Sequence, residues 1–268
     1  MDNRAIGIFD SGLGGLTCVK KVAEIMPGEN IIYFGDTGRV PYGTRSRDTI
    51  VKYVRQDINF LKSFDIKFII IACGTASSAA LPDIRGEVGT DIIGVLEPAC
   101  SAAVSATKNG KIGVIGTAGT INSGKYLQAI NGINPDIAVF SKACPMFVPL
   151  VENGYSDGEV AHIIAEDYLS PIKAEGVDTL IMGCTHYPLL RNEIQKIMGE
   201  GVTLIDAGAQ AAIAAKNLLT GQDKLCDRAV GTAQYYVSDT PDGFAELGSI
   251  FLDRDIEGNV KKIDIEKY

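Results

Sequence analysis

Short apolar runs rich in isoleucine and valine recur along the chain, and each is followed by a turn of small residues and a stretch with helical periodicity. Continuous apolar strands that alternate with helices are typical of parallel sheets covered on both faces. We therefore expect an α/β fold. The predicted strands are residues 5–9, 30–34, 67–72, 91–96, 111–115, 136–140, 179–182 and 202–205, and the clearest helical patterns are residues 13–26, 46–63, 158–174 and 209–219.

The same pattern occurs twice. Residues 6–9 (Ile-Gly-Ile-Phe) match residues 112–115 (Ile-Gly-Val-Ile) at an offset of 106, and residues 31–34 match residues 137–140 at that offset. We expect two similar α/β lobes with mainly parallel sheets around a central cleft, related by a pseudo-twofold axis. The first lobe is predicted to hold residues 1–98 with a C-terminal return, residues 210–268, and the second lobe residues 99–209.

The charge balance excludes some functions. A formal net charge of −8 argues against a nucleic-acid or membrane-surface binder, which usually presents a basic face. The first residues lack the basic segment and long apolar run of a secretory signal. The longest apolar run, residues 68–73, is too short to span a bilayer. We expect a cytoplasmic protein with reduced thiols that acts on a small molecule.

Six cysteines are present, and none forms a Cys-x-x-Cys pair. With only two histidines in the chain, a metal site is not expected. Cys73 and Cys184 are equivalent in the repeat, 111 residues apart, each after an apolar strand at the edge where open α/β sheets bind ligands. Free cysteines are usually small buried core residues, and we give that interpretation to the four without a repeated partner: Cys18, Cys100, Cys144 and Cys226.

Cys73 and Cys184 are each expected near a helix N-terminus, where the dipole and free N–H groups favour a thiolate. A free thiol has a pKa of about 8.5, so a modest decrease makes either one a usable base near neutral pH. Two thiols that face one cleft address opposite faces of one carbon atom, which is what a racemase needs. A disulfide between them is an alternative that a reducing compartment disfavours.

Four motifs resemble those of the glutamate racemases, over roughly residues 5 to 210. They are residues 7–15 (Gly-Ile-Phe-Asp-Ser-Gly-Leu-Gly-Gly), 35–43 (Gly-Asp-Thr-Gly-Arg-Val-Pro-Tyr-Gly), 72–77 (Ala-Cys-Gly-Thr-Ala-Ser) and 183–189 (Gly-Cys-Thr-His-Tyr-Pro-Leu). The resemblance implies racemisation of L-glutamate to D-glutamate by two cysteines, with no pyridoxal phosphate or metal. It also implies a homodimer and a supply of D-glutamate for peptidoglycan synthesis.

The resemblance further implies roles for individual residues. Cys73 would serve the D-isomer, assisted by Asp10. Cys184 would serve the L-isomer, assisted by His186, which Glu152 would orient. Hydroxyl groups and main-chain N–H groups would hold most of the substrate, from Asp10, Ser11, Tyr42, Gly43, Gly74, Thr75, Thr185 and His186.

Several of these residues also have a simpler interpretation. Asp10 and Ser11 follow a strand and precede a helix, so either is a candidate helix N-cap. His186 has the alternative of a hydrogen-bonded buried histidine. The sequence Pro41-Tyr42-Gly43 can also be interpreted as a plain turn.

Two local patterns depart from known motifs. The Gly12–Gly15 cluster does not complete the Gly-x-Gly-x-x-Gly of a dinucleotide-binding loop, because Thr17 occupies the last position. Gly74 stands where glutamate racemases usually have asparagine, which removes an amide that can contact the substrate. We interpret Gly74 as a change in affinity or substrate preference and not as loss of the reaction, because both cysteines remain.

Two other functions stay open. Aspartate racemase, or another amino-acid racemase of the same superfamily, would use the same pair of cysteines, and a panel of L-amino acids distinguishes these enzymes. A small-molecule binding protein of the periplasmic type also has two α/β lobes around a cleft. Ligand binding without inversion would indicate that class.

Overall fold

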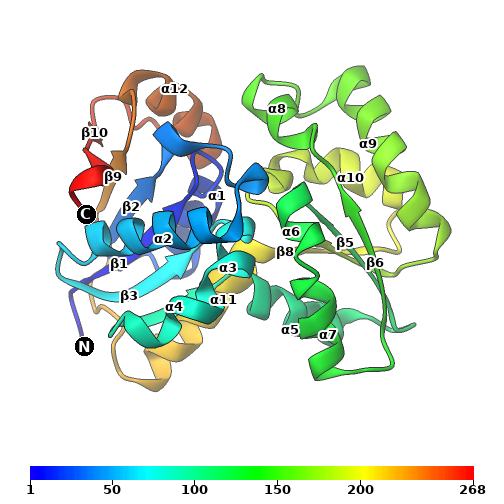
Figure 1. Ribbon diagram of the computed structural model, residues 1–268, viewed down its shortest axis with the longest axis horizontal. Coiled ribbons are helices and arrows are strands. Elements are labelled where there is room, and N and C mark those ends of the chain that lie inside the picture. Colours follow the sequence, from blue (N-terminus) through cyan, green and yellow to red (C-terminus); the bar gives the residue numbers. More distant parts are fainter.

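The computed structural model describes residues 1–268 as two lobes, each built on a parallel sheet (Figure 1). We call the first lobe the six-stranded sheet with the helices packed on it, and the second lobe the four-stranded sheet with its helices. The predicted α/β fold is confirmed. None of the helices combines the length and apolar character that a membrane-spanning segment needs.

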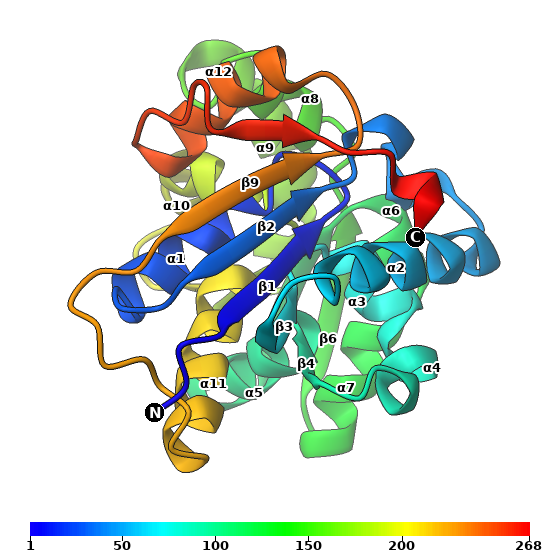
Figure 2. The same cartoon turned by 90° about the vertical axis from the view of Figure 1, so that its left-hand side faces the viewer.

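The first lobe has the strand order β10-β9-β2-β1-β3-β4, and every neighbouring pair is parallel (Figure 2). Its strands are β1 (Ala5–Asp10), β2 (Ile31–Gly35), β3 (Ile66–Ile71), β4 (Asp91–Gly94), β9 (Ala233–Val237) and β10 (Val260–Lys262). Its helices are α1 (Leu16–Ile25), α2 (Arg47–Leu61), α3 (Gly74–Ala79), α4 (Leu81–Ile84) and α12 (Pro241–Leu252), with 3-10 turns η1 (Thr37–Arg39), η2 (Tyr42–Thr44), η3 (Arg85–Glu87) and η5 (Ile265–Lys267).

The second lobe has the strand order β6-β5-β7-β8, again all parallel. Its strands are β5 (Lys111–Gly116), β6 (Ala138–Ala143), β7 (Thr179–Met182) and β8 (Thr203–Asp206). Its helices are α6 (Ala118–Asn122), α7 (Lys125–Ile133), α8 (Phe147–Glu152), α9 (Gly158–Ala174) and α10 (Arg191–Met198), with the 3-10 turn η4 (Tyr187–Leu190).

The strand orders of the two lobes correspond, since β2-β1-β3-β4 in the first lobe matches β6-β5-β7-β8 in the second. The repeated segments therefore occupy equivalent strands, β1 with β5 and β2 with β6. All eight predicted strands are present, and the largest difference is at β6, which begins at Ala138 and ends at Ala143. Most residues of this edge strand are partly or fully exposed, so burial does not mark its ends as it does for the central strands.

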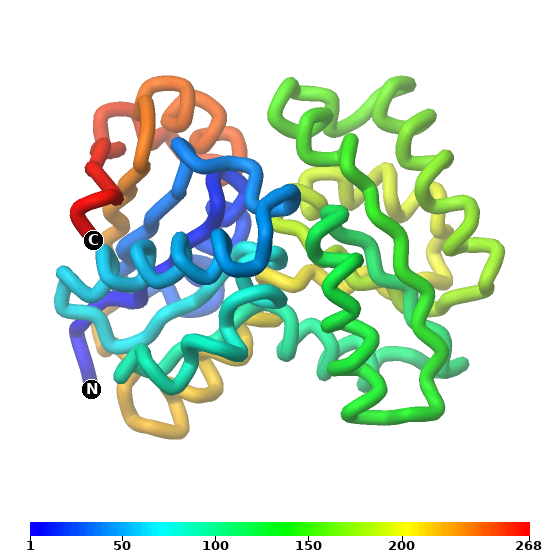
Figure 3. Tube along the Cα trace, in the orientation of Figure 1, coloured from blue at the N-terminus to red at the C-terminus, as the bar shows by residue number.

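Two helices, α5 (Leu96–Ala106) and α11 (Ala207–Gly221), carry the chain from the first lobe to the second and back (Figure 3). They pack against each other, and α11 also packs on α1. Both helices run across the predicted lobe boundaries, at 98/99 and 209/210, and the exact boundaries stay a prediction. The C-terminal segment packs on the first lobe, where β9 pairs with β2 and α12 packs on α1.

The apolar core is continuous between the lobes. One cluster of 55 buried residues runs from the β1 side of the first sheet through α1, α5 and α11 into the second sheet. A second cluster of 23 buried residues lies on the other face of the first sheet, under α2 and α3. Burial of apolar surface contributes about 25 cal/mol per Å². The two sheets are therefore held in one arrangement by the same core that forms each of them.

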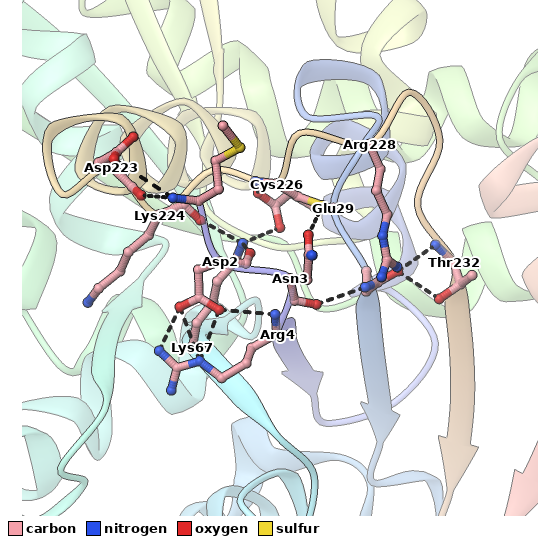
Figure 4. Close-up of polar contacts among 12 residues, drawn as sticks. Asp2, Asn3, Arg4, Glu29, Lys67, Asp223, Lys224, Cys226, Arg228 and Thr232 are labelled. Carbon is pink, nitrogen blue, oxygen red and sulfur yellow. Dashed lines mark hydrogen bonds and ion pairs between the residues drawn. The ribbon is translucent and has the colours of Figure 1, made fainter.

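A buried ion pair closes the end of the first lobe that is opposite the cleft (Figure 4). Lys67 of β3 has no exposed side-chain surface, and its Nζ lies 2.6 Å from Glu29 Oε2. The same ammonium donates to the main-chain oxygens of Asp2 and Lys224. Glu29 accepts the main-chain N–H of Cys226. The pair therefore joins the N-terminal residues to the segment between α11 and β9.

Candidate active site

A cavity with a volume of about 610 Å³ lies between the lobes, at the carboxyl ends of the central strands. Ligands bind at this edge in open α/β folds. The cavity brings together nearly all of the predicted site residues, which are Ser11, Tyr42, Gly43, Cys73, Gly74, Thr75, Glu152, Cys184, Thr185 and His186. Asp10 is not part of the lining and lies behind it, almost fully buried.

Cys73 directly precedes α3 and is its N-cap residue, as expected. Its Sγ accepts the N–H of Ala76 at 3.5 Å and lies 3.6 Å from the hydroxyl of Ser11. The expected decrease in its pKa is wrong. Burial and the nearby Asp10 carboxyl raise the pKa of Cys73 to about 12, and the contacts from Ala76 and Ser11 only partly oppose this rise. Cys73 is therefore a protonated thiol at neutral pH.

Cys184 follows β7 in the second lobe, in the position equivalent to Cys73. Its Sγ lies 3.9 Å from Nδ1 of His186, and Nε2 of that ring lies 2.9 Å from Glu152 Oε1. Burial by itself lowers the pKa of His186. The hydrogen bonds to Cys184 and Glu152, together with the Asp10 charge, outweigh burial and raise this pKa to about 10. The imidazole is therefore a cation near neutral pH, and its Nδ1 lies beside the Cys184 sulfur.

Asp10 ends β1 and has both a structural and an electrostatic role. Its Oδ2 accepts the N–H groups of Gly12 and Gly15, so it holds the turn that leads into α1. Its Oδ1 is buried and makes no hydrogen bond. Burial raises the pKa of Asp10, while His186 and the main-chain donors lower it. The N-cap alternative is wrong for Asp10 and Ser11, because Gly15 is the N-cap residue of α1 and no side chain caps the helix. The Asp10 carboxylate instead fixes the turn that precedes the helix.

The hydroxyl of Tyr42 does not point into the cavity. It is hydrogen-bonded to the buried carboxyl groups of Asp36 and Asp57, and the whole residue is only 1% exposed. Contact between Tyr42 and a substrate therefore has to come from the main chain or the ring edge. Gly43, next in the chain, lies against Thr117 of the second lobe.

Sequence analysis missed two threonines of the second lobe that line the cavity, Thr117 and Thr120. The Thr75 hydroxyl lies 3.0 Å from the Thr117 hydroxyl and 3.2 Å from that of Thr120, so these three side chains join the lobes. The repeat contains the signal that would have found the first of them. An offset of 106 places Thr117 in the position of Ser11, directly after β5.

The C-terminal return also supplies part of the wall. Gly243, Phe244 and Leu247 of α12 line the cavity, and Phe251 contacts the His186 ring edge-on at 5.6 Å between centroids. Sequence analysis predicted the return of this segment but no part in the site. Because α12 belongs to the first lobe and His186 to the second, this wall also spans the cleft.

The remaining cysteines and the second histidine lie elsewhere. All six cysteines are free, so the disulfide alternative for Cys73 and Cys184 is wrong. The buried-core interpretation is confirmed for Cys18, Cys100 and Cys144 and is wrong for Cys226, which is partly exposed and contacts Asn3. His162 pairs with Glu193 on the surface of the second lobe. No group of three His, Cys, Asp or Glu side chains is placed to hold a metal ion.

The chain as a whole is similar to several known proteins. The model of the Asp/Glu/Hydantoin racemase family matches residues 6–215. A glutamate racemase of Geobacter metallireducens is 46% identical over 98% of this chain and 97% of its own length. The structure of glutamate racemase isoform RacE1 from Bacillus anthracis superposes with a TM-score of 0.95 at 36% identity, covering 98% of both chains. The structure of glutamate racemase from Francisella tularensis in complex with D-glutamate superposes with a TM-score of 0.92 at 38% identity, covering the full length of both chains.

Proposed function

Because the chain belongs to the Asp/Glu/Hydantoin racemase family and is an amino-acid racemase, we propose that it interconverts L- and D-glutamate through Cys73 and Cys184, without a cofactor. The observation that carries the proposal is that one cavity is lined by two free cysteines, one from each lobe. The glutamate racemases among its relatives, one of them solved with D-glutamate, support glutamate as the substrate.

The surroundings of the two cysteines differ in a way that suits one acid and one base. Cys73 is buried and has a raised pKa, so it holds its proton. The Cys184 sulfur lies 3.9 Å from Nδ1 of the His186 imidazolium, a cation beside the sulfur that takes up the α-proton in the proposed reaction. We therefore assign Cys184 as the base that deprotonates L-glutamate and Cys73 as the acid on the opposite face.

The proposed step moves two protons and leaves the charge balanced. The Cys184 thiolate takes the α-proton from one face of L-glutamate and becomes a thiol. Cys73 gives its proton to the other face and becomes a thiolate, so D-glutamate forms. The reverse reaction runs through the same steps in the opposite order. After release, one proton must return from Cys184 to Cys73 through solvent before the next L-glutamate reacts.

The α-proton is a very weak acid, so the cavity must also stabilise the carbanion. Three threonines line it from both lobes: Thr75, Thr117 and Thr185. Oriented donors of this kind contribute about 2.7–4 kcal/mol each where they have been removed from other enzymes. Closure of the lobes excludes water and strengthens them.

The test is racemisation of L-glutamate by the purified protein with no added cofactor, followed by chiral analysis. We expect D-glutamate from wild type and none above background from Cys73→Ala or Cys184→Ala. Wild-type rates in both variants would contradict the two-thiol proposal. L-Aspartate and other L-amino acids belong in the same assay, and inversion of aspartate but not glutamate would move the proposal to the alternative substrate.

We further propose that the D-glutamate serves peptidoglycan synthesis, and that the protein acts in the cytoplasm as a homodimer. Growth of a bacterium that requires D-glutamate, after the gene is supplied, tests the first point. A variant with Cys184→Ala is the matched control and should not support growth. Light scattering of the purified protein tests the second, with twice the mass of the 28.5 kDa chain expected.

A further inference from the structure

A buried polar cluster lies beneath the segment that leads from β2 to α2, outside the cavity. Asp36 and Asp57 have no exposed side-chain surface, and Arg39 lies between them. Its Nε is 2.6 Å from Asp36 Oδ2, its Nη2 is 3.0 Å from Asp57 Oδ1, and the guanidinium stacks on the ring of Tyr53. One cation thus faces two buried carboxyl groups, an arrangement that is costly when both are ionised.

Tyr42 adds a second constraint. Its Oη lies 2.5 Å from Asp36 Oδ2 and 3.0 Å from Asp57 Oδ2. A phenol has one proton to donate, and an ionised carboxylate can only accept. Both contacts are hydrogen bonds only when one of the two carboxyl groups keeps its own proton.

The surrounding donors assign that proton to Asp57. Asp36 Oδ2 accepts from both Arg39 and Tyr42, and Asp36 Oδ1 accepts the Ser238 hydroxyl at 2.8 Å. Asp57 accepts a bond from Arg39 on Oδ1, and its Oδ2 faces only Tyr42. The consistent chain of donation therefore runs from Asp57 Oδ2–H to Tyr42 Oη, and from Tyr42 Oη–H to Asp36.

The charges around Asp57 favour its neutral form. Burial raises the pKa of this carboxyl well above its usual range, and Asp36 raises it further. Arg39 and the Tyr42 hydrogen bond oppose the rise. The titratable and charged groups at the cluster are Asp10 of β1, Asp36, Arg39 and Tyr42 of the segment between β2 and α2, Tyr53 of α2 and Glu266 of η5.

The cluster is linked to the cavity through η2. Tyr42 begins this turn, and the residues from Val40 to Thr44 line the cavity. Gly43 is in close contact with the second lobe, because a Cβ added at Gly119 of α6 would lie 2.7 Å from the Gly43 carbonyl oxygen. The Tyr42–Gly43 turn is therefore held between the buried cluster and α6.

We propose that Asp57 is a positioning residue for the racemase: as a neutral carboxylic acid it donates to Tyr42 and so fixes the Tyr42–Gly43 turn at the cavity. The inference rests on the proposed function only for the identity of the substrate. When Asp57 ionises, two carboxylates compete for the single proton of Tyr42. The Tyr42 hydroxyl then loses one of its two hydrogen bonds, and the turn is held less firmly.

Two substitutions of Asp57 separate a positioning role from simple packing. Asp57→Asn keeps a donor toward Tyr42 and an acceptor for Arg39, so we expect kcat/KM close to wild type. Asp57→Leu has a similar volume and neither group, and we expect a decrease of about 10-fold or more, because a shift of ~1 Å can cost 10²-fold. A decline of the wild-type rate as Asp57 ionises at high pH should be absent in Asp57→Asn. Equal activity of the two variants would overturn the proposal.

A double-mutant cycle tests whether Asp57 acts through Tyr42. Tyr42→Phe should lower kcat/KM by a factor similar to that of Asp57→Leu. The double variant should be no worse than either single variant, since both break the same hydrogen bond. Additive losses would show that Asp57 acts by another route and would overturn the proposal.

Infrared difference spectroscopy tests the protonation state without using activity or the leucine variant. The spectrum of wild type minus Asp57→Asn at neutral pH should contain the C=O stretch of a protonated carboxylic acid. Loss of carboxylate bands alone would overturn the proposal and leave the racemase function untouched. Conversely, a protein inactive on glutamate would still give the carboxylic acid band, so the two failures are distinguishable.

Discussion

Gly74 lies so close to the main-chain carbonyl of Gly183 that a Cβ added at Gly74 would stand 2.3 Å from that oxygen. The contact joins the residue after Cys73 to the residue before Cys184, across the two lobes. It therefore sets the separation of the turns that carry both thiols. The absence of a side chain at Gly74 allows this approach, and the asparagine that is usual here in glutamate racemases would need the two turns to lie farther apart.

We expect Gly74→Ala to force the two turns apart and lower kcat/KM by about 10²-fold, because misplacement of reacting groups by ~1 Å has effects of that size. Racemisation kinetics with L-glutamate measure it. Gly86→Ala is the matched control, since a Cβ there meets no atom within 4 Å, and it should leave the rate unchanged. Wild-type kinetics in Gly74→Ala would show that the contact does not set the distance between the thiols.

Glu152→Gln removes the carboxylate that holds Nε2 of His186. Burial lowers the pKa of His186, and the hydrogen bonds to Cys184 and Glu152 raise it to about 10. Without the carboxylate the imidazolium is lost at lower pH. We expect the alkaline limb of kcat/KM for L-glutamate to move to lower pH, with a decrease of roughly 10-fold at pH about 9.

The control for Glu152 is Glu159→Gln at an exposed position of α9, which should leave the pH profile unchanged. The same pKa shift has a consequence for stability. His186 binds its proton more tightly in the folded state than in the unfolded state, where its pKa is about 6.5. The resulting stabilisation is fully present below pH about 6.5 and is lost as the pH rises toward 10. Glu152→Gln should therefore destabilise more at pH about 6 than at pH about 9.5 in urea unfolding; an equal loss at both would contradict the role of the imidazolium.

Lys67→Met leaves the carboxylate of Glu29 buried without its cation. Removal of one partner of a buried pair typically costs 3–5 kcal/mol, and we expect a decrease of about that size in the free energy of unfolding. Lys224→Met is the matched control, because its pair with Asp91 is partly exposed and worth about 1 kcal/mol or less. Similar stabilities of the two variants in urea titrations would refute the structural role of the buried pair.

Much of the fold could be predicted from the sequence because the central strands are buried on both faces. A run such as residues 68–71 (Phe-Ile-Ile-Ile) is then apolar throughout, and the sequence shows the strand. The strand β10 was missed, since Val260 is the only apolar residue among its three and it pairs at the edge of the sheet. Edge strands carry little burial signal, so only tertiary contacts reveal them.

Some of the site residues could likewise be predicted from the sequence, and others could not. Cys73 and Cys184 were found because the repeat places them after equivalent strands, and Thr117 was available from the same offset. Asp57 could not be identified from the sequence, because within α2 it has the pattern of an ordinary polar helix residue. Only the packing of η1 and η2 against it reveals its burial. The direction of the Cys73 pKa shift also depends on burial, which local position at a helix N-terminus does not determine.

The most direct test of the two-thiol account is the position of deuterium when L-glutamate is racemised in D₂O and analysed at low conversion. Because the base and the acid are different thiols, the account predicts that the D-glutamate formed carries deuterium at Cα while the remaining L-glutamate keeps hydrogen. Deuterium in equal proportion in both isomers, or hydrogen retained in the product, would contradict it.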